Sequence, residues 1–266
     1  MRKRFVEIIS VGNELLTGHT LNTNAYWIAK QVTDAGGIVK RVTVVSDEVT
    51  EIASAIRESL RRQVYWIIVS GGLGPTYDDK TLQGLARALG QKLVVNKKAV
   101  KMLGRKYQRT SNPTLTPSRI KMAILPAKAE PLENPIGHAP AVVVKHASCL
   151  IFSLPGVPTE MMAIFTKHMI PVLKRKIGEI VRIETNLETT SVMESVIAPY
   201  LHKVVASNPA VYIKSHPRGY KKGTSKLHIS LVCESRNRRA TEKSLRKAVR
   251  EMRQSVIDAG GKVREI

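Results

Sequence analysis

The chain has 266 residues, 43% of them hydrophobic, which is enough for one large domain or for a typical domain with a smaller companion. The formal net charge of +22 raises nucleic acid as a partner, but aromatic residues, at 5%, are few for a base-stacking surface, and polyphosphate small molecules suit the charge equally well. Two cysteines without CxxC spacing argue against a disulfide framework, and no apolar run of about 18 residues exists, so a cytoplasmic protein with no membrane partner is expected.

The first part of the chain alternates strand-like and helix-like segments. Short apolar runs rich in β-branched residues predict strands at residues 5–11, 38–45 and 64–69. Each run is followed by apolar residues at helical spacing, as in Ile52, Ala55, Ile56 and Leu60. This alternation predicts an α/β fold with three layers and a mostly parallel sheet.

The junction after the third predicted strand is rich in glycine and ends in paired acidic residues. It contains Gly71, Gly72, Gly74, Asp78 and Asp79, and a helix is predicted to follow. Glycines let backbone N–H groups approach a ligand closely, and a helix N-terminus adds a positive dipole end, so the junction suits a phosphate. Paired carboxylates suit a metal ion that accompanies it. An ordinary tight turn is the alternative, because the pattern is neither a P-loop nor a GxGxxG fingerprint.

Four carboxylates follow predicted strand ends: Glu14, Asp47, Asp78 and Asp79. Ligands of parallel α/β sheets bind outside the carboxyl ends of the strands, so these side chains are expected to share one rim. Each of them alone would be read as a helix cap or a solvated loop residue. Their shared rim favours a functional role for Asp47 and Asp79.

Residues 97–122 predict two short helices, broken at Asn112–Pro113, with many basic side chains. The basic residues are Lys97, Lys98, Lys101, Arg105, Lys106, Arg109, Arg119 and Lys121. Such a charge run is usually a solvated helix face, and we favour that interpretation. A hairpin or two adjacent strands follow over residues 141–154, and Pro158 is suited to the first turn of the next helix.

A boundary is predicted near Pro171–Gly178, which gives a first domain over residues 1–173 and a second over residues 174–266. The second domain has the pattern strand, helix, strand, strand, helix and a short final strand. This predicts a small α+β domain with two helices packed on a sheet.

Four motifs together resemble CinA-like proteins, and they occur in that family's order over about residues 5–170. They are Ile9–Gly18 with Asn22–Asn24, Ser70–Thr76 with Asp78–Asp79, Asn134–Pro140, and Leu154–Met161. The resemblance implies a molybdopterin-binding domain of the MoaB/Mog type, and the second domain resembles the KH-like domain that follows it. The nicotinamide-mononucleotide deamidase domain of many bacterial CinA chains is missing here, so deamidation is not expected. A homo-oligomer is expected because related folds assemble as dimers or trimers.

The resemblance implies two activities for this domain type. One is metal-dependent hydrolysis of a nucleotide pyrophosphate such as ADP-ribose, and the other is binding or adenylylation of molybdopterin. Leu73 stands where the Mog branch usually has threonine, which favours the hydrolase. His138 replaces a small polar residue of the family's loop and is expected either to alter specificity or to be tolerated.

The hypothesis is therefore a hydrolase in which Asp47 and Asp79 are catalytic and hold a divalent cation such as Mg²⁺, with Asp78 and Glu14 as further ligands. The expected phosphate- and nucleotide-binding residues are Gly71, Gly72, Leu73, Gly74, Thr76, Asn22, Asn24, Asn134, Gly137, Pro155 and Gly156. An adenylyltransferase and a non-catalytic pterin or nucleotide carrier are the alternatives. Nucleic-acid binding is not favoured, because the Gly219–Gly223 segment has one residue too many for the Gly-x-x-Gly loop of RNA-binding KH domains.

Overall fold

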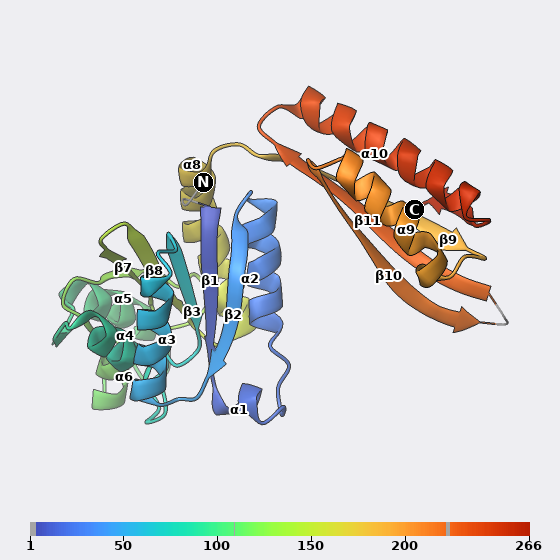
Figure 1. Ribbon diagram of the computed structural model, residues 1–266. Coiled ribbons are helices and arrows are strands. Elements are labelled where there is room, and N and C mark those ends of the chain that lie inside the picture. The colour runs from blue at the N-terminus through green and yellow to red at the C-terminus, as the bar shows by residue number, and fades with distance from the viewer. Residues whose placement is uncertain (1–3, 109, 222–223) are drawn as a thin grey trace. The chain divides into compact units, whose positions relative to one another are not determined.

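The computed structural model describes residues 4–108, 110–221 and 224–266 and divides the chain into two compact units (Figure 1). The units are Met1–Gly178 and Glu179–Ile266, and the boundary predicted after residue 173 falls within helix α8, Ile170–Ile177. Arg109 of the basic run lies outside the described residues, as do Lys222 and Gly223 of the proposed KH-like loop. None of the described helices is both long and apolar enough to span a membrane.

The first unit is built on a six-stranded sheet with the order β2-β1-β3-β8-β7-β6. The strands are β1 (Phe5–Val11), β2 (Ile38–Val45), β3 (Trp66–Ser70), β6 (Glu130–Leu132), β7 (Ala141–His146) and β8 (Cys149–Leu154). Strands β1, β2, β3 and β8 pair in parallel, whereas at one edge β7 pairs antiparallel with β8, and β6 pairs antiparallel with β7. The predicted mostly parallel sheet is confirmed. Two further short strands, β4 (Leu93–Val95) and β5 (Ile124–Pro126), form a separate pair.

Helices cover both faces of this sheet, which gives the three predicted layers (Figure 1). They are α1 (Asn13–Leu16), α2 (Thr23–Asp34), α3 (Val49–Arg61), α4 (Thr81–Leu89), α5 (Lys97–Tyr107), α6 (Pro117–Lys121) and α7 (Pro158–Ile164), which continues through a π-helical turn (Phe165–Met169) into α8. On one face, Ile52 of α3 and Leu85 of α4 belong to the same buried cluster as Ile67 of β3. On the face that α2 covers, Trp27 of α2 contacts Phe165 of the π-helical turn edge-on, with ring centroids 5.3 Å apart.

The second unit is a four-stranded antiparallel sheet with the order β10-β11-β9-β12. Its strands are β9 (Val181–Thr190), β10 (Val211–Lys221), β11 (Thr224–Ser235) and β12 (Lys262–Glu265). Helices α9 (Glu194–Ser207) and α10 (Arg238–Asp258) bury Ile197, Leu245 and Met252 in one cluster with Leu187 and Leu231 of the sheet. The predicted small α+β unit is thus confirmed.

An ion pair between the buried Glu7 of β1 and Arg62, the residue that follows α3, joins these two elements of the first unit. Glu7 is 2% exposed, and its carboxylate accepts hydrogen bonds from Ser59 at 2.7 Å and from Arg62 at 2.8 Å. Burial alone would raise the pKa of Glu7, but the hydrogen bonds from Arg62 and Ser59 outweigh it and hold that pKa below its usual value. Glu7 is therefore ionised at neutral pH, and its buried carboxylate links β1 to Ser59 of α3 and to Arg62.

We expect Glu7→Gln to lower the free energy of unfolding by about 2 kcal/mol at pH 7, because Arg62 then loses its buried counter-charge. The wild-type advantage should shrink as pH falls through the low pKa of Glu7, since a carboxyl whose pKa is depressed by folding stabilises only while it is ionised. Urea unfolding of both proteins between pH 7 and pH 3 measures this. Glu58→Gln, which removes the exposed partner of Arg62, is the control and should cost about 0.5 kcal/mol or less. Equal losses for both variants would contradict the assignment.

Candidate functional site

A turn of two glycines ends β3 and lies against the ends of β1 and β8. Gly71 has a φ of +108°, and a Cβ there would lie 2.2 Å from the carbonyl oxygen of Val11. The Gly71 N–H donates to the Leu154 carbonyl at 3.0 Å, and the Thr81 hydroxyl donates to the Gly71 carbonyl at 2.7 Å. Only glycine fits this position, because both the φ and the close approach exclude a side chain.

The residues after Gly71 offer backbone donors. Within the described structure no hydrogen bond is made by the N–H groups of Gly72, Leu73 and Gly74, whereas the Thr81 N–H at the start of α4 donates to Gly72. Leu73 is buried, whereas Gly72 and Gly74 on either side of it are partly exposed. Successive unpaired N–H groups in a turn are a typical anion-binding arrangement. The donors thus come from the turn itself, and residues 75–80 separate it from the helix.

Thr76 organises the acidic end of this segment. The Asp79 carboxylate accepts from the Thr76 N–H at 2.9 Å, and the Thr76 hydroxyl lies 2.5 Å from oxygens of both Asp78 and Asp79. The hydrogen bond from Thr76 lowers the pKa of the exposed Asp78. Both carboxylates are therefore held by the loop itself, and the nearest cation, Lys121, donates to the Thr76 carbonyl.

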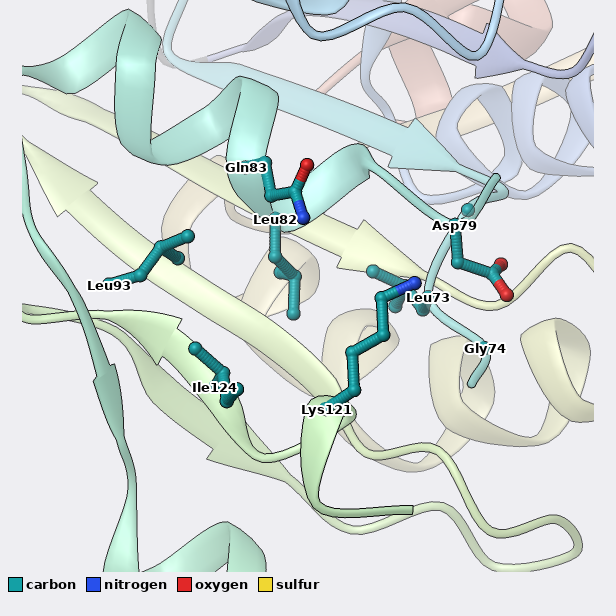
Figure 2. Close-up of a pocket in the computed structure, with 9 residues that line it drawn as sticks. Leu73, Gly74, Asp79, Leu82, Gln83, Leu93, Lys121 and Ile124 are labelled. Atoms are coloured by element: carbon teal, nitrogen blue, oxygen red, sulfur yellow. The ribbon is translucent and has the colours of Figure 1, made fainter. Parts of the chain in front are cut away.

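A pocket of about 50 Å³ opens on one side of the glycine turn, and we call it the lysine pocket (Figure 2). It is lined by Gly72, Leu73, Gly74, Asp79, Leu82, Gln83, Leu93, Lys121 and Ile124. Lys121 reaches toward the turn from the end of α6, past an apolar wall formed by α4 and the β4–β5 pair. From the sequence, Lys121 was expected on a solvated basic helix face, and nothing in the neighbouring residues distinguished it from the other basic side chains of this segment.

A second pocket of about 100 Å³ lies on the other side of the turn, and we call it the asparagine pocket. Its lining includes Asn22, Asn24, Glu14, Gly71 and Gly156. The Asn24 amide nitrogen donates to the Gly156 carbonyl at 2.7 Å and to the Ser70 hydroxyl at 3.0 Å. Its oxygen is buried without a hydrogen-bond partner among the described residues.

The asparagines of this pocket also hold the fold together. The Asn22 oxygen caps α2 by accepting from the Ala25 N–H at 3.1 Å, and its nitrogen donates to Ser10 at 3.0 Å. Pro155 is buried, and its carbonyl accepts from Ser70 at 3.4 Å. The two strand-end segments are thereby tied to the glycine turn, so the pocket is largely formed before any ligand arrives.

The four carboxylates do not gather at one point. Asp47 accepts from the Asn13 N–H at 2.8 Å, at the start of α1, whereas the carboxylate of Glu14 folds back over Gly12. Among the described residues there is no group of three or more histidine, cysteine, aspartate or glutamate side chains placed to share a metal ion. The residues present do not form a complete protein ligand set, and we derive no step through a metal. The divalent cation stays a prediction.

The loop over residues 134–140 lines neither pocket. Asn134 is 2% exposed, its oxygen accepts from the Gly137 N–H at 2.8 Å, and its nitrogen donates to Glu160 at 2.6 Å. A Cβ on Gly137 would lie 2.0 Å from the Glu160 carboxyl group, so a larger residue there would displace that side chain from Asn134. The ring of His138 stacks on Tyr107 with centroids 4.3 Å apart. These contacts give the loop its shape, and a direct role in ligand binding stays a prediction.

The cysteines offer no reactive thiol. Both are buried, and burial raises the pKa of Cys149 to about 12. A thiol with such a pKa stays protonated at neutral pH and is a poor nucleophile. The candidate chemistry therefore rests on backbone N–H groups, amides, carboxylates and one lysine.

Comparison with known proteins gives consistent matches. Residues 7–175 match the family described as "Probable molybdopterin binding domain". A protein of Aeropyrum pernix is 42% identical over 97% of this chain and 96% of its own length, and one of Sulfolobus acidocaldarius is 38% identical over the whole of both chains. The crystal structure of CinA from Thermoplasma acidophilum, a protein with unknown function, is 41% identical to this chain with a TM-score of 0.59, and the match covers 64% of this chain and 98% of that one.

We expect Gly71→Ala to lower the free energy of unfolding by about 3 kcal/mol or more, because the new methyl group would strain the backbone and overlap the Val11 carbonyl. The matched control is Gly156→Ala at the same rim, where a Cβ would make an ordinary 3.5 Å contact. It should change stability by about 0.5 kcal/mol or less. Thermal and urea unfolding of the two variants test this, and a well-tolerated Gly71→Ala would refute the packing argument.

Proposed function

Because the chain belongs to the molybdopterin binding domain family and its N-terminal unit is CinA-like, we propose that it binds a molybdopterin-like pterin phosphate. The phosphate would lie against the glycine turn, Gly71–Gly74. The single observation that carries this proposal is the row of unpaired N–H groups on Gly72, Leu73 and Gly74, which line a pocket together with Lys121. Backbone donors and a lysine are complementary to a phosphate in both charge and hydrogen bonding.

The asparagine pocket would take the neighbouring part of the ligand. It shares the glycine turn with the lysine pocket, since Gly71 lines one and Gly72 the other. The Asn24 oxygen is buried and has no partner among the described residues, and a small turn of this side chain would bring it to an N–H of a pterin or a hydroxyl of a sugar. A ligand that bridges the turn would use both sets of polar groups.

The negative charge of Asp79 opposes binding of a phosphate at the glycine turn. Its carboxylate lines the lysine pocket beside the unpaired N–H groups, so it would repel an incoming phosphate. A divalent cation held by Asp79 and by phosphate oxygens would remove that repulsion, and Mg²⁺ commonly binds in this way with only one or two protein carboxylates. We therefore keep Mg²⁺ as a proposal in which the ligand supplies part of the coordination.

Hydrolysis of a nucleotide pyrophosphate such as ADP-ribose is the second candidate. The feature of this chain that favours it is the Gly-Gly-Leu-Gly form of the turn. In that reaction Asp47 and Asp79 would be the catalytic carboxylates. Adenylylation of the bound pterin, with ATP as the donor, is the third candidate activity. A homo-oligomer stays a prediction.

We expect Lys121→Ala to weaken binding of molybdopterin by about tenfold or more, because it removes a charged partner of the phosphate. Anaerobic titration followed by pterin fluorescence, with and without Mg²⁺, measures the dissociation constant. Lys101→Ala, on the exposed side of α5, is the matched control and should leave it within about twofold. No saturable binding to the wild-type protein, or equal effects of both variants, would contradict the proposal.

Product analysis separates the three activities. The wild-type protein is incubated with ADP-ribose and Mg²⁺, and in parallel with molybdopterin, ATP and Mg²⁺. AMP and ribose phosphate indicate the hydrolase, an adenylylated pterin indicates the transferase, and binding without either product indicates a carrier. If ADP-ribose is hydrolysed equally fast by wild type and Asp79→Ala, the catalytic role of Asp79 is wrong.

A further inference from the structure

The second unit contains a strand edge that its own sheet covers only in part. Strand β12 pairs with β9 over Leu187–Thr190, and the Ile266 N–H donates to the Asn186 carbonyl at 3.0 Å. Since alternate residues of a strand turn their backbone groups to the same side, Arg182 and Glu184 direct their N–H and C=O groups to this side too. Within the described residues no strand pairs with that part of the edge.

A groove of about 960 Å³ lies between this open edge and helix α10. Its apolar lining comes from Ile183 of β9 and from Leu245, Val249 and Ile257 of α10. Ile257 is 56% exposed, so an apolar surface faces solvent beside unpaired backbone groups. An extended chain in this groove would both complete the ladder of β9 and cover that surface.

Charge selects among possible occupants. The groove is lined by five arginines, Arg182, Arg238, Arg246, Arg250 and Arg253, and by three glutamates, Glu184, Glu242 and Glu265. The glutamates are all engaged in ion pairs with arginines of this set, whereas Arg250 has no ion pair among the described residues. The surplus is positive, in a chain whose formal net charge is +22. An acidic occupant is attracted, and a second copy of this chain is repelled.

We propose that this groove binds an extended acidic peptide, which adds a strand to β9 beyond the end of β12. A peptide backbone presents N–H and C=O groups alternately, as the open edge does, whereas the phosphates of a nucleic-acid backbone are acceptors only and cannot continue a strand ladder. Apolar side chains of the peptide would meet the aliphatic lining, and acidic side chains would meet the arginines beside it. This surface is separate from the glycine turn, so the proposal does not depend on the proposed function.

The probe is a fluorescein-labelled, end-capped peptide of four Val-Glu repeats, titrated with the full-length protein. The matched probe has four Val-Lys repeats, and fluorescence anisotropy gives both dissociation constants. We expect the acidic peptide to bind at least about tenfold more tightly than the basic one, with a difference that shrinks as salt is added. Equal affinities would refute the charge argument.

Two pairs of variants separate backbone pairing from charge. Glu184→Pro removes the N–H group that faces the groove, at an edge position where proline is tolerated, and should weaken the acidic peptide by about tenfold, whereas Glu184→Ala retains binding. Arg250→Glu should weaken it by about tenfold, whereas Lys243→Glu, which makes the same charge change on α10 outside the groove, should stay within about threefold. Circular dichroism confirms that each variant is folded.

Three results would overturn the proposal. The first is equal peptide affinity of Glu184→Pro and Glu184→Ala, because strand addition requires the backbone donor. The second is tight binding of an oligouridine by a protein that ignores the acidic peptide, which would assign the surface to nucleic acid. The third is a dimer that Arg250→Glu strengthens and Glu184→Pro abolishes, which would assign the edge to a second copy.

Discussion

The first unit depends on the close contact between Gly71 and the Val11 carbonyl. A backbone that passes this near to a neighbouring strand end has no room for a side chain, and its φ of +108° is open in practice only to glycine. The contact joins the carboxyl ends of β1 and β3, and the Gly71 N–H extends it to β8. The start of α4 is set by the same turn, through Thr81. Both pockets exist because the chain turns here.

This arrangement also explains the unusual charge pattern at the rim. The carboxylates that are expected to converge make local hydrogen bonds instead. Asp47 accepts from the Asn13 N–H at the start of α1, and Asp79 accepts from the Thr76 N–H. The rim therefore combines fixed negative charges with unpaired N–H groups and one lysine, all within a strongly basic chain. A ligand that carries both negative charge and hydrogen-bond donors matches such a mixture better than a simple anion, since each charge and polar group then has a partner.

The fold was largely predictable, and the site only in part. Most of the strands and helices, and the turn at Gly71, follow from local patterns, because periodicity and glycine content reflect short-range geometry. Strands β4, β5 and β6 were not predicted, because three residues are too few to show a period. The helix across residues 170–177 was missed because Pro171 and Gly178 look like loop residues, although proline fits a first turn and glycine a last one. Asn134 and Gly137 give the 134–140 loop its shape through contacts with Glu160, which the sequence did not indicate, and their role in ligand binding stays a prediction.

By itself, the sequence determined the layered α/β unit, the small α+β unit, and the glycine turn at the end of β3, because these features are encoded in residues close together along the chain. Tertiary structure alone decided that Lys121 lines a pocket with the glycine turn and contacts Thr76, 45 residues earlier in the chain, and that the turn divides two pockets. It also decided that β12 leaves part of β9 open beside the arginines of α10. Such features depend on how separate elements pack against one another. That packing is set by side-chain burial and by strand register, and a local sequence pattern contains neither.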